Sequence, residues 1–227
     1  MTAESTTPTT AIVLLGGAPL DPSVVGALPV ASQVIAADSG AHDAESLGLR
    51  VDVVIGDMDS IAPTALAAVR ALGTEVVRHP SDKNETDAEL ALLHAAQLGA
   101  KRIIVVSAGG GRLDHQLSLV ALLFQDALRN IDVEARIGTA RVFPVRDHES
   151  RTIASKSGDL VGLLPFGGDA HGVITHGLQW PLHNESLSVT ASRGVSNRAV
   201  GDHFNVSVQS GRLLVTVDQP EQNKTEA

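Results

Sequence analysis

Short apolar runs alternate with helical patterns through the first part of the chain. Six runs have the length and composition of buried strands, and several are separated by segments with helical spacing. The clearest helix is predicted at residues 86–99, where Thr86 and Glu89 form a capping box, and others at 63–73 and 114–129. The expected strands are AIVLL (11–15), QVIAA (33–37), VDVVI (51–55), TEVVRH (74–79), RIIVVS (102–107) and DVEARI (132–137). This alternation predicts a mainly parallel, doubly wound sheet covered on both faces.

The pattern changes after about residue 140. The apolar runs become shorter, Gly, Asp, Asn and Ser separate them, and no further segment has helical length and period. The runs are RVFPVR (141–146), RTIAS (151–155), LVGLLPF (160–166), GVITHGL (172–178), NVSVQS (205–210) and LLVTVD (213–218). Short strands between turn residues are typical of an antiparallel sandwich or barrel. We therefore predict an α/β N-terminal domain at 11–140 and an all-β (sandwich) C-terminal domain at 141–218, between disordered tails at 1–10 and 219–227.

Composition narrows the class of protein. The chain has 227 residues, 43% of them hydrophobic, a formal net charge of −9 and no conspicuous cluster of Lys and Arg. Since nucleic acids bind basic surfaces, we expect no nucleic-acid partner. No apolar run approaches the roughly 20 residues of a membrane-spanning helix, so we expect no membrane association. Cysteine is absent and the N-terminus does not resemble a signal peptide, and both features favour a cytoplasmic location.

Two acids stand two residues apart directly after the third expected strand, in the segment GDMDS. If the chain stays extended there, Asp57 and Asp59 point their carboxylates to the same side. Like charges that close are tolerated when a cation lies between them, and carboxylate oxygens suit Mg²⁺. A solvated turn, with Asp59 or Ser60 capping the next helix, explains the pair equally well. The pair alone therefore leaves a metal site and a plain turn open.

Acids follow the neighbouring strands as well. Asp38 ends the second strand, Asp87 lies just inside the helix after the fourth, and Asp114 follows the fifth. Each could merely cap a helix or complement its dipole. The carboxyl ends of parallel strands, however, lie at one edge of the sheet, where open α/β folds bind ligands. Acids at four consecutive strand ends therefore favour a site for a metal ion and phosphate groups.

A glycine-rich segment, AGGGRLDH, could receive the phosphates. Gly109, Gly110 and Gly111 leave backbone N–H groups free to face an anion. Arg112 offers a planar fork for phosphate oxygens, and Lys83 is a second candidate contact. The plainer alternatives are an ordinary turn and a solvated lysine. The chain has no Walker A, GxGxxG or HExxH motif, so a nucleotide site must be of another type.

The β half supplies candidates for binding a flat ring. Trp180 is the only tryptophan, and it could pack in the core or stack on a heteroaromatic ligand, especially a cationic one. Ser196 and Asn197, in the turn-like segment RGVSNRA, could donate hydrogen bonds to ring nitrogens or simply close a hairpin. A binding role and a structural role both stay open for these residues.

With these motifs in view, the chain resembles the thiamine pyrophosphokinase (thiamine diphosphokinase) family. ADSGA is similar to that family's ADGGA, GDMDSI to its GDFDSI, SDKNETDAELAL to its DKDxTDxxxAL and GGRLDH to its GGRxDH. LQWPL and GVSN are similar to its tryptophan-containing segment and its Ser-Asn motif. The resemblance runs in order over about residues 11–217, and the ordered set is far more specific than any single motif.

The resemblance implies an activity and a set of roles. The activity is transfer of an intact pyrophosphoryl group from the co-substrate ATP to the hydroxyl of thiamine, releasing AMP, in a homodimer with thiamine bound near the subunit interface. The implied roles are Mg²⁺ binding for Asp57, Asp59 and Asp87, further active-site acids at Asp38 and Asp114, ATP-phosphate contacts from Gly110, Gly111 and Arg112, and thiamine contacts from Trp180, Ser196 and Asn197. Either Asp114 or Asp38 would accept the proton of the hydroxyl.

Three positions depart from the family's pattern. Ser39 replaces a glycine, the segment SAGGGR around Ala108 is a variant of GAxGGR, and Leu119 stands where many members carry Asn. These departures bear on the shape of the glycine loop and on one polar contact. They leave the acids of the expected metal site unchanged.

Three other functions use similar acids. The first is a pyrophosphokinase for another heterocyclic alcohol, such as a hydroxymethylpterin, from which Trp180 with Ser196 and Asn197 would distinguish this chain. The second is a non-catalytic sensor of thiamine or a nucleotide, against which the retention of all five acids argues. The third is a sugar-nucleotide transferase, in which Asp87 and GGRLDH are not expected. Release of AMP separates pyrophosphokinases from other transferases.

Overall fold

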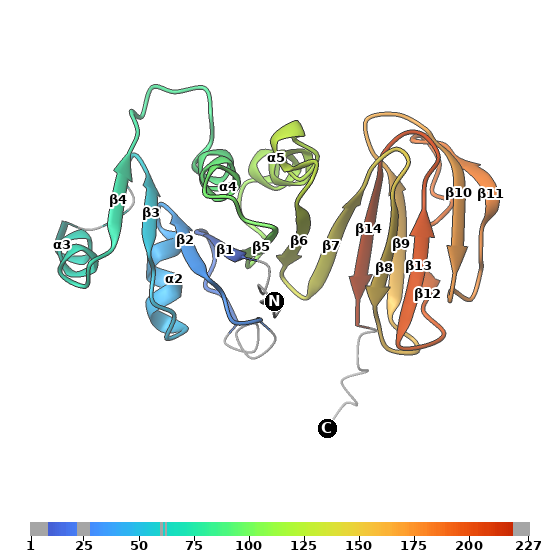
Figure 1. Cartoon of the computed structure of the whole chain (residues 1–227), viewed down its shortest axis with the longest axis horizontal. Coiled ribbons are helices and arrows are strands. Elements are labelled where there is room, and N and C mark those ends of the chain that lie inside the picture. Colours follow the sequence, from blue (N-terminus) through green and yellow to red (C-terminus); the bar gives the residue numbers. More distant parts are fainter. Residues whose placement is uncertain (1–8, 22–27, 60, 62, 220–227) are drawn as a thin grey trace, which may run out of the picture. The chain divides into compact units, whose positions relative to one another are not determined.

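The computed structural model describes residues 9–21, 28–59, 61 and 63–219, and the chain divides into two compact units (Figure 1). One unit ends at residue 138 and the other begins at residue 139. The tails expected at both ends lie almost wholly outside the described residues. Among the helices described, none has the length and apolar character needed to cross a membrane.

The first unit contains parallel strands in the order β6-β5-β1-β2-β3-β4, as the alternating pattern predicts. Its elements are β1 (Thr10–Leu15), β2 (Gln33–Ala37), α2 (Gly40–Ser46), β3 (Val53–Gly56), α3 (Pro63–Ala71), β4 (Glu75–Arg78), α4 (Asp87–Gln97), β5 (Arg102–Ser107), α5 (Leu113–Leu122), the 3₁₀ turn η1 (Asp126–Leu128) and β6 (Asp132–Ile137). The strands β2, β3 and β4 follow one another on one side of β1, whereas β5 and β6 lie on its other side, so the strand order reverses between β1 and β5. Because all these strands are parallel, their carboxyl ends lie at one edge of the sheet.

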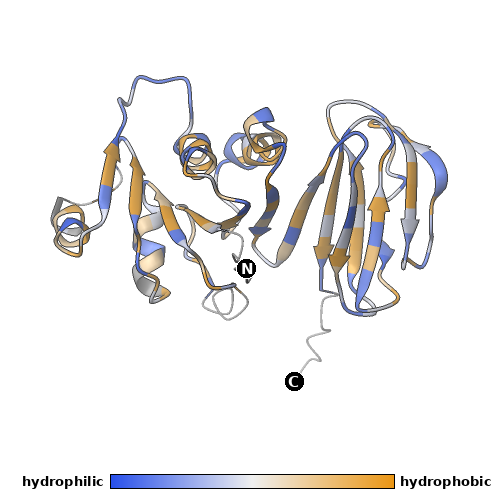
Figure 2. Ribbon diagram, in the orientation of Figure 1, coloured by the Kyte–Doolittle hydropathy of each residue, from blue (hydrophilic) through white to orange (hydrophobic). Residues whose placement is uncertain are grey.

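The strands β1, β2, β3 and β5 are buried on both faces of this sheet, which explains their continuous apolar runs, whereas the edge strand β4 is partly exposed. On one face Ile12, Val34 and Ile104 pack in a cluster with Ala44 of α2. On the other face α4 crosses β1, β2 and β3 and buries Leu92, which is not part of that cluster. Figure 2 shows these strands as mostly hydrophobic. Each buried aliphatic side chain contributes about 1.5–3 kcal/mol to folding, so the sheet forms a firm base for the loops at its edge.

The helix predicted at 114–129 is shorter than expected. It ends at Leu122, and a separate 3₁₀ turn follows at Asp126–Leu128. Gln125 has extended backbone angles (φ −57°, ψ 143°), which break the helical path. The change of direction lets Leu123 and Leu128 be fully buried, which one straight helix would not allow because they lie five residues apart. The uniform apolar pattern of this segment concealed the break.

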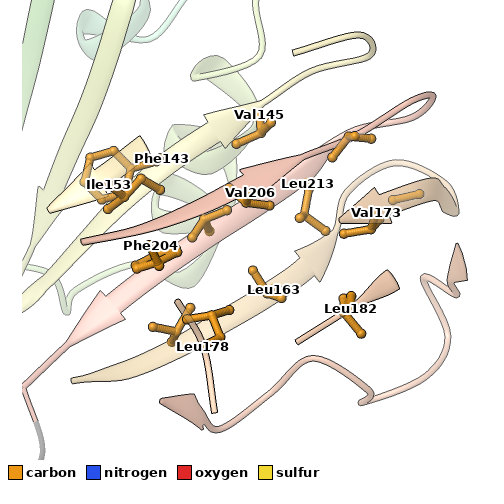
Figure 3. Close-up of a cluster of buried hydrophobic side chains, with 14 of the residues drawn as sticks. Phe143, Val145, Ile153, Leu163, Val173, Leu178, Leu182, Phe204, Val206 and Leu213 are labelled. Carbon is orange, nitrogen blue, oxygen red and sulfur yellow. The ribbon is translucent and has the colours of Figure 1, made fainter. Parts of the chain in front are cut away.

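The second unit is a sandwich of two antiparallel sheets. Its strands are β7 (Ala140–Val145), β8 (Ser150–Ala154), β9 (Leu160–Pro165), β10 (Ala170–His176), β11 (His183–Leu187), β12 (Asn197–Arg198), β13 (His203–Ser207) and β14 (Leu213–Asp218). One sheet has the order β12-β9-β14-β7 and the other β11-β10-β13-β8. Side chains from both sheets, among them Phe143, Leu163 and Phe204, form one buried core (Figure 3). The predicted all-β sandwich is confirmed.

Two strands of the sandwich were not predicted. The strand β11 has the sequence HNESL and buries only Leu187, so it lacks the apolar alternation of a strand. The strand β12 has two residues, Asn197 and Arg198, which pair with Val161 and Leu160. Pairing with another strand, rather than local pattern, creates both elements: β11 pairs with the preceding strand β10, and β12 with the more distant β9.

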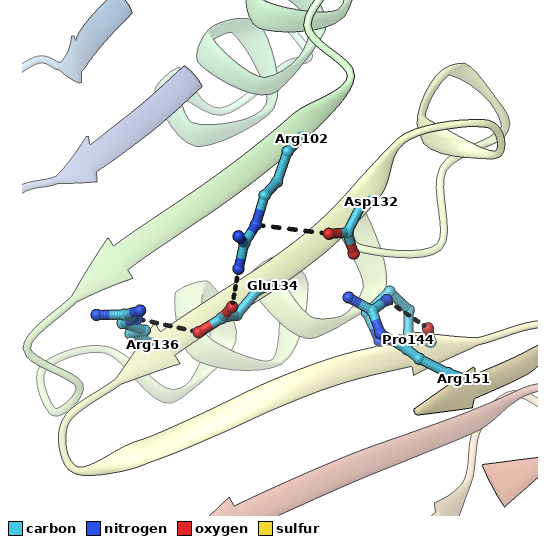
Figure 4. A network of polar contacts seen from close by, with 6 residues as sticks. All are labelled: Arg102, Asp132, Glu134, Arg136, Pro144 and Arg151. Carbon is cyan, nitrogen blue, oxygen red and sulfur yellow. Dashed lines mark hydrogen bonds and ion pairs between the residues drawn. The ribbon is translucent and has the colours of Figure 1, made fainter. Parts of the chain in front are cut away.

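A charged network lies on β5 and β6 (Figure 4). Glu134 is buried, and its carboxylate accepts hydrogen bonds from Arg102 at 2.9 Å and from Arg136 at 3.0 Å. Asp132 pairs with Arg102 at 3.5 Å. Asp132, Glu134 and Arg136 alternate along β6, so their side chains share a face of the strand. In the second unit, Arg151 similarly donates to the carbonyl of Pro144 at 3.4 Å.

Candidate active site

A cavity of about 360 Å³ opens at the carboxyl edge of the parallel strands. The strand ends of β1, β2, β5 and β6 and parts of α4 and α5 form its walls, and all lie within the first unit. It lies where the strand order reverses, at β1 and β5, which is the usual ligand site of open α/β sheets. Its lining includes Gly16, Asp38, Lys83, Asp87 and Gly110. Four of the predicted site residues therefore line one hollow.

Three carboxylates gather beside this cavity. Asp38, Asp57 and Asp59 each offer one oxygen atom, and these oxygens lie within 4.8 Å of one another. Asp38 also lines the cavity, so it belongs to both features. Hard anionic oxygens at this spacing suit a divalent cation such as Mg²⁺. The predicted convergence of acids from β2 and β3 is therefore present.

The turn between Asp57 and Asp59 differs from the extended geometry that we expected. Met58 has φ 65°, a left-handed conformation, and its side chain is buried. The backbone N–H of Asp59 donates to Oδ1 of Asp57 at 3.1 Å, which closes a tight turn. The carboxylates thus approach because the chain turns, and the expected reason, an extended strand, was wrong. Ser60, which we considered as a helix cap, lies outside the described residues.

Gly56 sets the spacing of the acids. A Cβ atom built at this residue would lie 3.1 Å from Cβ of Asp38 and 3.2 Å from Cγ of Asp87. Its φ of 152° is also one that residues with side chains rarely adopt. Asp38 itself has φ 44°, and its backbone carbonyl accepts from Ala41 at the start of α2. Two unusual backbone conformations therefore bring the ends of β2 and β3 and the start of α4 together.

Asp87 occupies the first turn of α4, as predicted. The Thr86 hydroxyl accepts a hydrogen bond from the Glu89 backbone N–H at 3.2 Å, which is half of the expected capping box. The Glu89 carboxylate instead accepts from Gln125 at 2.6 Å. Oδ1 of Asp87 lies 3.0 Å from Nζ of Lys83, whereas the compact oxygen group is formed by the other three acids. Asp87 therefore lies next to that group of oxygens and forms an ion pair with the ammonium group of Lys83.

Asp57 is held in its ionised form. The hydrogen bond from the backbone of Asp59 is the largest influence, and it lowers the pKa of Asp57. Burial acts in the opposite direction, while the side chain of Ser81 and the charge of Lys83 lower the pKa further. A carboxylate that is already ionised and oriented is ready to bind a cation without first losing a proton.

The glycine loop lies on the other side of the cavity. Gly109, Gly110 and Gly111 all have φ between 72° and 74°, a left-handed conformation that favours glycine. Gln116 steadies the loop by donating to the carbonyl of Gly110 at 2.8 Å. Gly110 lines the cavity, and a run of such residues can turn backbone N–H groups toward an anion. The loop is therefore suited to a phosphate, as its sequence suggests.

Arg112 and Asp114 bind each other. Nε of Arg112 donates to Oδ1 of Asp114 at 3.1 Å, and an Nη atom donates to Oδ2 at 2.6 Å. Both side chains are mostly exposed, and neither lines the cavity. The hydrogen bond from Arg112 lowers the pKa of Asp114, which makes this carboxylate a weaker base. The structure thus places Asp114 apart from the other four acids.

The candidate ring-binding residues of the second unit form a small hydrogen-bonded assembly. Asn197 is buried, and its Oδ1 accepts from the backbone N–H groups of Trp180 at 3.1 Å and Arg198 at 2.8 Å. Its Nδ2 donates to the carbonyl of Trp180 at 2.8 Å. Trp180 is 54% exposed, and Ser196 is exposed with φ 62°. Asn197 therefore fixes the backbone that presents Trp180 to solvent.

Both halves of the chain match models of one family. Residues 27–135 match the model described as thiamin pyrophosphokinase, catalytic domain, and residues 148–214 match its vitamin B1 binding domain. The chain belongs to the thiamine pyrophosphokinase family. Membership confirms the resemblance drawn from the ordered motifs. The acid cluster and most of the cavity lining lie in the part that matches the catalytic domain, and Trp180, Ser196 and Asn197 lie in the other part.

Curated relatives carry the same family name. Thiamine pyrophosphokinase 1 of Oryza sativa subsp. japonica is 30% identical over 168 residues, which cover 69% of this chain and 63% of that protein. Thiamine pyrophosphokinase of Bacillus subtilis (strain 168) is 24% identical over 208 residues, covering 90% of this chain and 96% of that protein. The chain thus spans less than two thirds of the length of the plant relative, and nearly all of the bacterial one.

Solved structures share the family fold. The crystal structure of thiamine pyrophosphokinase from Bacillus subtilis has a TM-score of 0.82 at 22% identity, covering 93% of this chain and 100% of that one. Thiamin pyrophosphokinase from Candida albicans has a TM-score of 0.79 at 16% identity, covering 94% and 90%. An α/β half followed by an antiparallel β half is therefore the architecture of this family.

Several residues around the site were missed from the sequence. Gly16 is one of them, since it lines the cavity. A Cβ built at Gly16 would lie 1.9 Å from Oγ of Ser39, so the side chain at this departure from the family's pattern packs against a glycine. Leu119, noted from the sequence only as a departure from the family's pattern, is buried and lines the cavity. Ser81 was missed as a partner of Asp57. The Gly-Gly pair that ends β1 at the reversal of strand order was the available signal for Gly16.

Proposed function

We propose that this chain transfers the pyrophosphoryl group of ATP to the hydroxyl of thiamine, giving thiamine diphosphate and AMP. The observation that carries the proposal is the meeting of Asp38, Asp57 and Asp59 beside a cavity, all three in the part of the chain that matches the catalytic-domain model. The names of the curated relatives support thiamine and a pyrophosphate donor as the substrates. A cytoplasmic location accords with ATP as the co-substrate.

The donor set fits Mg²⁺. Asp57 and Asp59 are the ligands on which the motif and the observed geometry agree. Two acids are candidates for the third ligand. Asp38 is the one whose oxygen lies close to those of Asp57 and Asp59, and Asp87, which pairs with Lys83, is the one that the family motif implies. When bound there, Mg²⁺ would neutralise charge on the ATP phosphates and help to align the β-phosphorus.

The reaction moves one bond and one proton. The thiamine hydroxyl oxygen forms a bond to the β-phosphorus of ATP, and the bond from that phosphorus to the α,β-bridging oxygen breaks, so AMP leaves with the electron pair. The hydroxyl proton passes to a carboxylate. Of the two candidates, we favour Asp38, because it lines the cavity, whereas Asp114 lies outside it and is bound by Arg112. In this role Asp38 both orients and deprotonates the nucleophile.

The glycine loop is the proposed phosphate contact. Backbone N–H groups at Gly110 and Gly111 would offset charge on the leaving phosphate, and Gly110 lines the cavity. Arg112 would join them by exchanging Asp114 for a phosphate, which its exposed position permits. Lys83 is proposed as a further phosphate contact, and its position in the cavity lining, beside Asp87, supports this role.

Residues of the second unit are the proposed contacts for thiamine. Trp180 would stack on a ring of thiamine, and Ser196 would donate a hydrogen bond to it. Asn197 would act with them by holding the Trp180 backbone. We further propose a homodimer with its active site near the subunit interface, as the family resemblance implies. The exposed apolar side chains of Trp180, Val195 and Val200 support a covered surface in this region.

Product analysis tests the proposal. Purified protein is incubated with thiamine, ATP and Mg²⁺, and the products are separated and quantified. Equal amounts of thiamine diphosphate and AMP are expected. Absence of thiamine diphosphate from a folded protein would overturn thiamine as the substrate and direct the same assay to other heterocyclic alcohols. A nucleoside diphosphate in place of AMP would overturn pyrophosphoryl transfer itself.

A further inference from the structure

Lys83 lies among the acids rather than in solvent. Its Nζ is 3.0 Å from Oδ1 of Asp87 and 3.9 Å from Oδ2 of Asp57. The side chain is only 11% exposed, although Lys83 belongs to the loop before α4. An ammonium group that is so well covered needs anionic partners close by, and two acids meet that need. Lys83 is therefore part of the charge balance of the acid cluster.

The oxygens of Asp57 have different neighbours. Oδ1 accepts the N–H of Asp59, whereas Oδ2 faces Lys83. Asp87 directs Oδ1 to the same ammonium group. Lys83 thus links two acids that come from β3 and α4, while Asp57 also belongs to the oxygen group with Asp38 and Asp59. One fixed positive charge lies at the junction between the compact group and Asp87.

A fixed charge in this position changes what the acids can bind. Asp38, Asp57, Asp59 and Asp87 would together carry four negative charges, which is enough to attract two divalent cations. Lys83 cancels one of these charges and also lies on the Asp57–Asp87 side, where a second cation would have to bind. Repulsion between an ammonium group and a divalent ion at such distances is strong in a partly buried site.

Resting on the proposed function, we propose that Lys83 is a positioning residue whose ammonium group takes the place of one divalent cation beside Asp57 and Asp87. When no nucleotide is bound, the acid cluster therefore holds a single divalent ion, and holds it loosely. This role differs from a phosphate contact, because it acts before ATP binds. It makes Lys83 the residue that sets how many metal ions the acids hold and how tightly.

Mn²⁺ binding without nucleotide tests the proposal, with free Mn²⁺ followed by electron paramagnetic resonance. The variants are Lys83→Met and Lys83→Gln, which remove the charge, and Lys83→Arg, which keeps it. Lys101→Met, at an exposed lysine of the same unit, is the matched control. The wild type, Lys83→Arg and the control are expected to bind one Mn²⁺. The uncharged variants are expected to bind the first ion at least about tenfold more tightly and to gain a second.

The outcomes separate this inference from the proposed function. Unchanged affinity and number of Mn²⁺ ions in both uncharged variants, with weaker ATP binding alone, would show that Lys83 is only a phosphate contact and would overturn the inference. Weaker Mn²⁺ binding in folded uncharged variants would overturn it too. If the wild type bound no Mn²⁺ at all, the metal site of the proposed function would fail first. Melting temperatures with and without Mn²⁺ identify any variant that does not fold, and the second uncharged variant then decides.

Discussion

The two units bring their candidate residues together in different ways. In the first unit Asp38, Asp57 and Asp87 follow separate strands, and parallel strands carry all three to one edge of the sheet. In the second unit the strands are antiparallel, so successive loops alternate between opposite ends of the sandwich. Trp180 and Asn197 meet there only through pairing of segments distant in sequence. The order of motifs thus predicts a site in a parallel sheet, whereas in a sandwich the strand pairing must be known.

Removal of one acid from the first unit is expected to have the largest effect. Asp57→Asn takes away a candidate metal ligand, and its turnover is expected to fall by at least about 10³-fold, because a catalytic metal contributes several kcal/mol of transition-state stabilisation. Steady-state rates at saturating Mg²⁺ measure this, with circular dichroism to show an intact fold. Asp202→Asn, an equal change of charge at an exposed residue of the second unit, should stay near wild type. Comparable rates for the two variants would contradict the assignment.

Crowding the acids should have the next largest effect. Gly56→Ala introduces a Cβ near 3.1 Å from Asp38 and 3.2 Å from Asp87, at a φ of 152°. A shift of about 1 Å at a reacting centre lowers rates by about 10²-fold, so a loss of that order is expected. The strained backbone should also lower the free energy of unfolding by about 1–3 kcal/mol. Gly168→Ala, where a Cβ meets nothing within 4 Å, is the control and should change neither quantity.

A change at Asn197 tests the second unit, where a smaller effect is expected. Asn197→Ala removes three hydrogen bonds, two of them to the backbone of Trp180. The KM for thiamine is expected to rise about tenfold with little change in turnover, because binding is lost equally from substrate and transition state. Kinetics at varied thiamine and quenching of Trp180 fluorescence by thiamine measure the change.

Asn205→Ala is the matched control for this variant, because Asn205 also makes side-chain hydrogen bonds within the sandwich. It should retain the wild-type KM and the quenching of fluorescence. If both variants behaved alike, loss of Asn197 would act through general loosening of the sandwich. If thiamine failed to quench Trp180 in the wild type at saturation, with and without a nucleotide analogue, the stacking role would be wrong.

The smallest expected effect concerns the Arg112–Asp114 pair. Arg112→Ala should raise the pKa of Asp114 toward its ordinary value, because the hydrogen bond from Arg112 is the main cause of its lowered pKa. A carboxylate with a lowered pKa stabilises the fold above its unfolded pKa, near 3.9, and that contribution is lost as pH falls through the folded pKa. NMR titration of the Asp114 carboxyl carbon measures the shift. Arg50→Ala, at an exposed arginine before β3, should leave the titration unchanged.

Much of the first unit could be predicted because most of its strands are buried on both faces and appear as continuous apolar runs. The acids at the strand ends and the Thr86 cap were also visible in the sequence. The left-handed turn at Met58 was not, since nothing in a methionine indicates a positive φ. The long side chain of Lys83 can point to phosphate or to acids, and only the fold selects between these directions.

The strand β11 of the sandwich and the position of Asp114 could not be predicted from the sequence. The strand β11 is polar and gains its place only by pairing with β10, so no local pattern marks it. Arg112 and Asp114 stand two residues apart, and Arg112 donates two hydrogen bonds to the Asp114 carboxylate. This local pairing keeps Asp114 away from the other acids, although it follows a strand of the same sheet. Sequence position alone does not distinguish Asp114 from Asp38, whereas the cavity lining includes only Asp38.

The central place of β1 also has a consequence for the order of folding. Ala11 of β1 pairs with Gln33 on one side and with Ile103 on the other. Each doubling of loop length adds about 0.6 kcal/mol of closure entropy, so the pairing with β5 carries the greater entropic penalty and is expected to form later. The strands β1, β2 and β3, which position the acids, then assemble from one continuous stretch of chain. During synthesis the residues of the acid cluster are made before the glycine loop that follows β5.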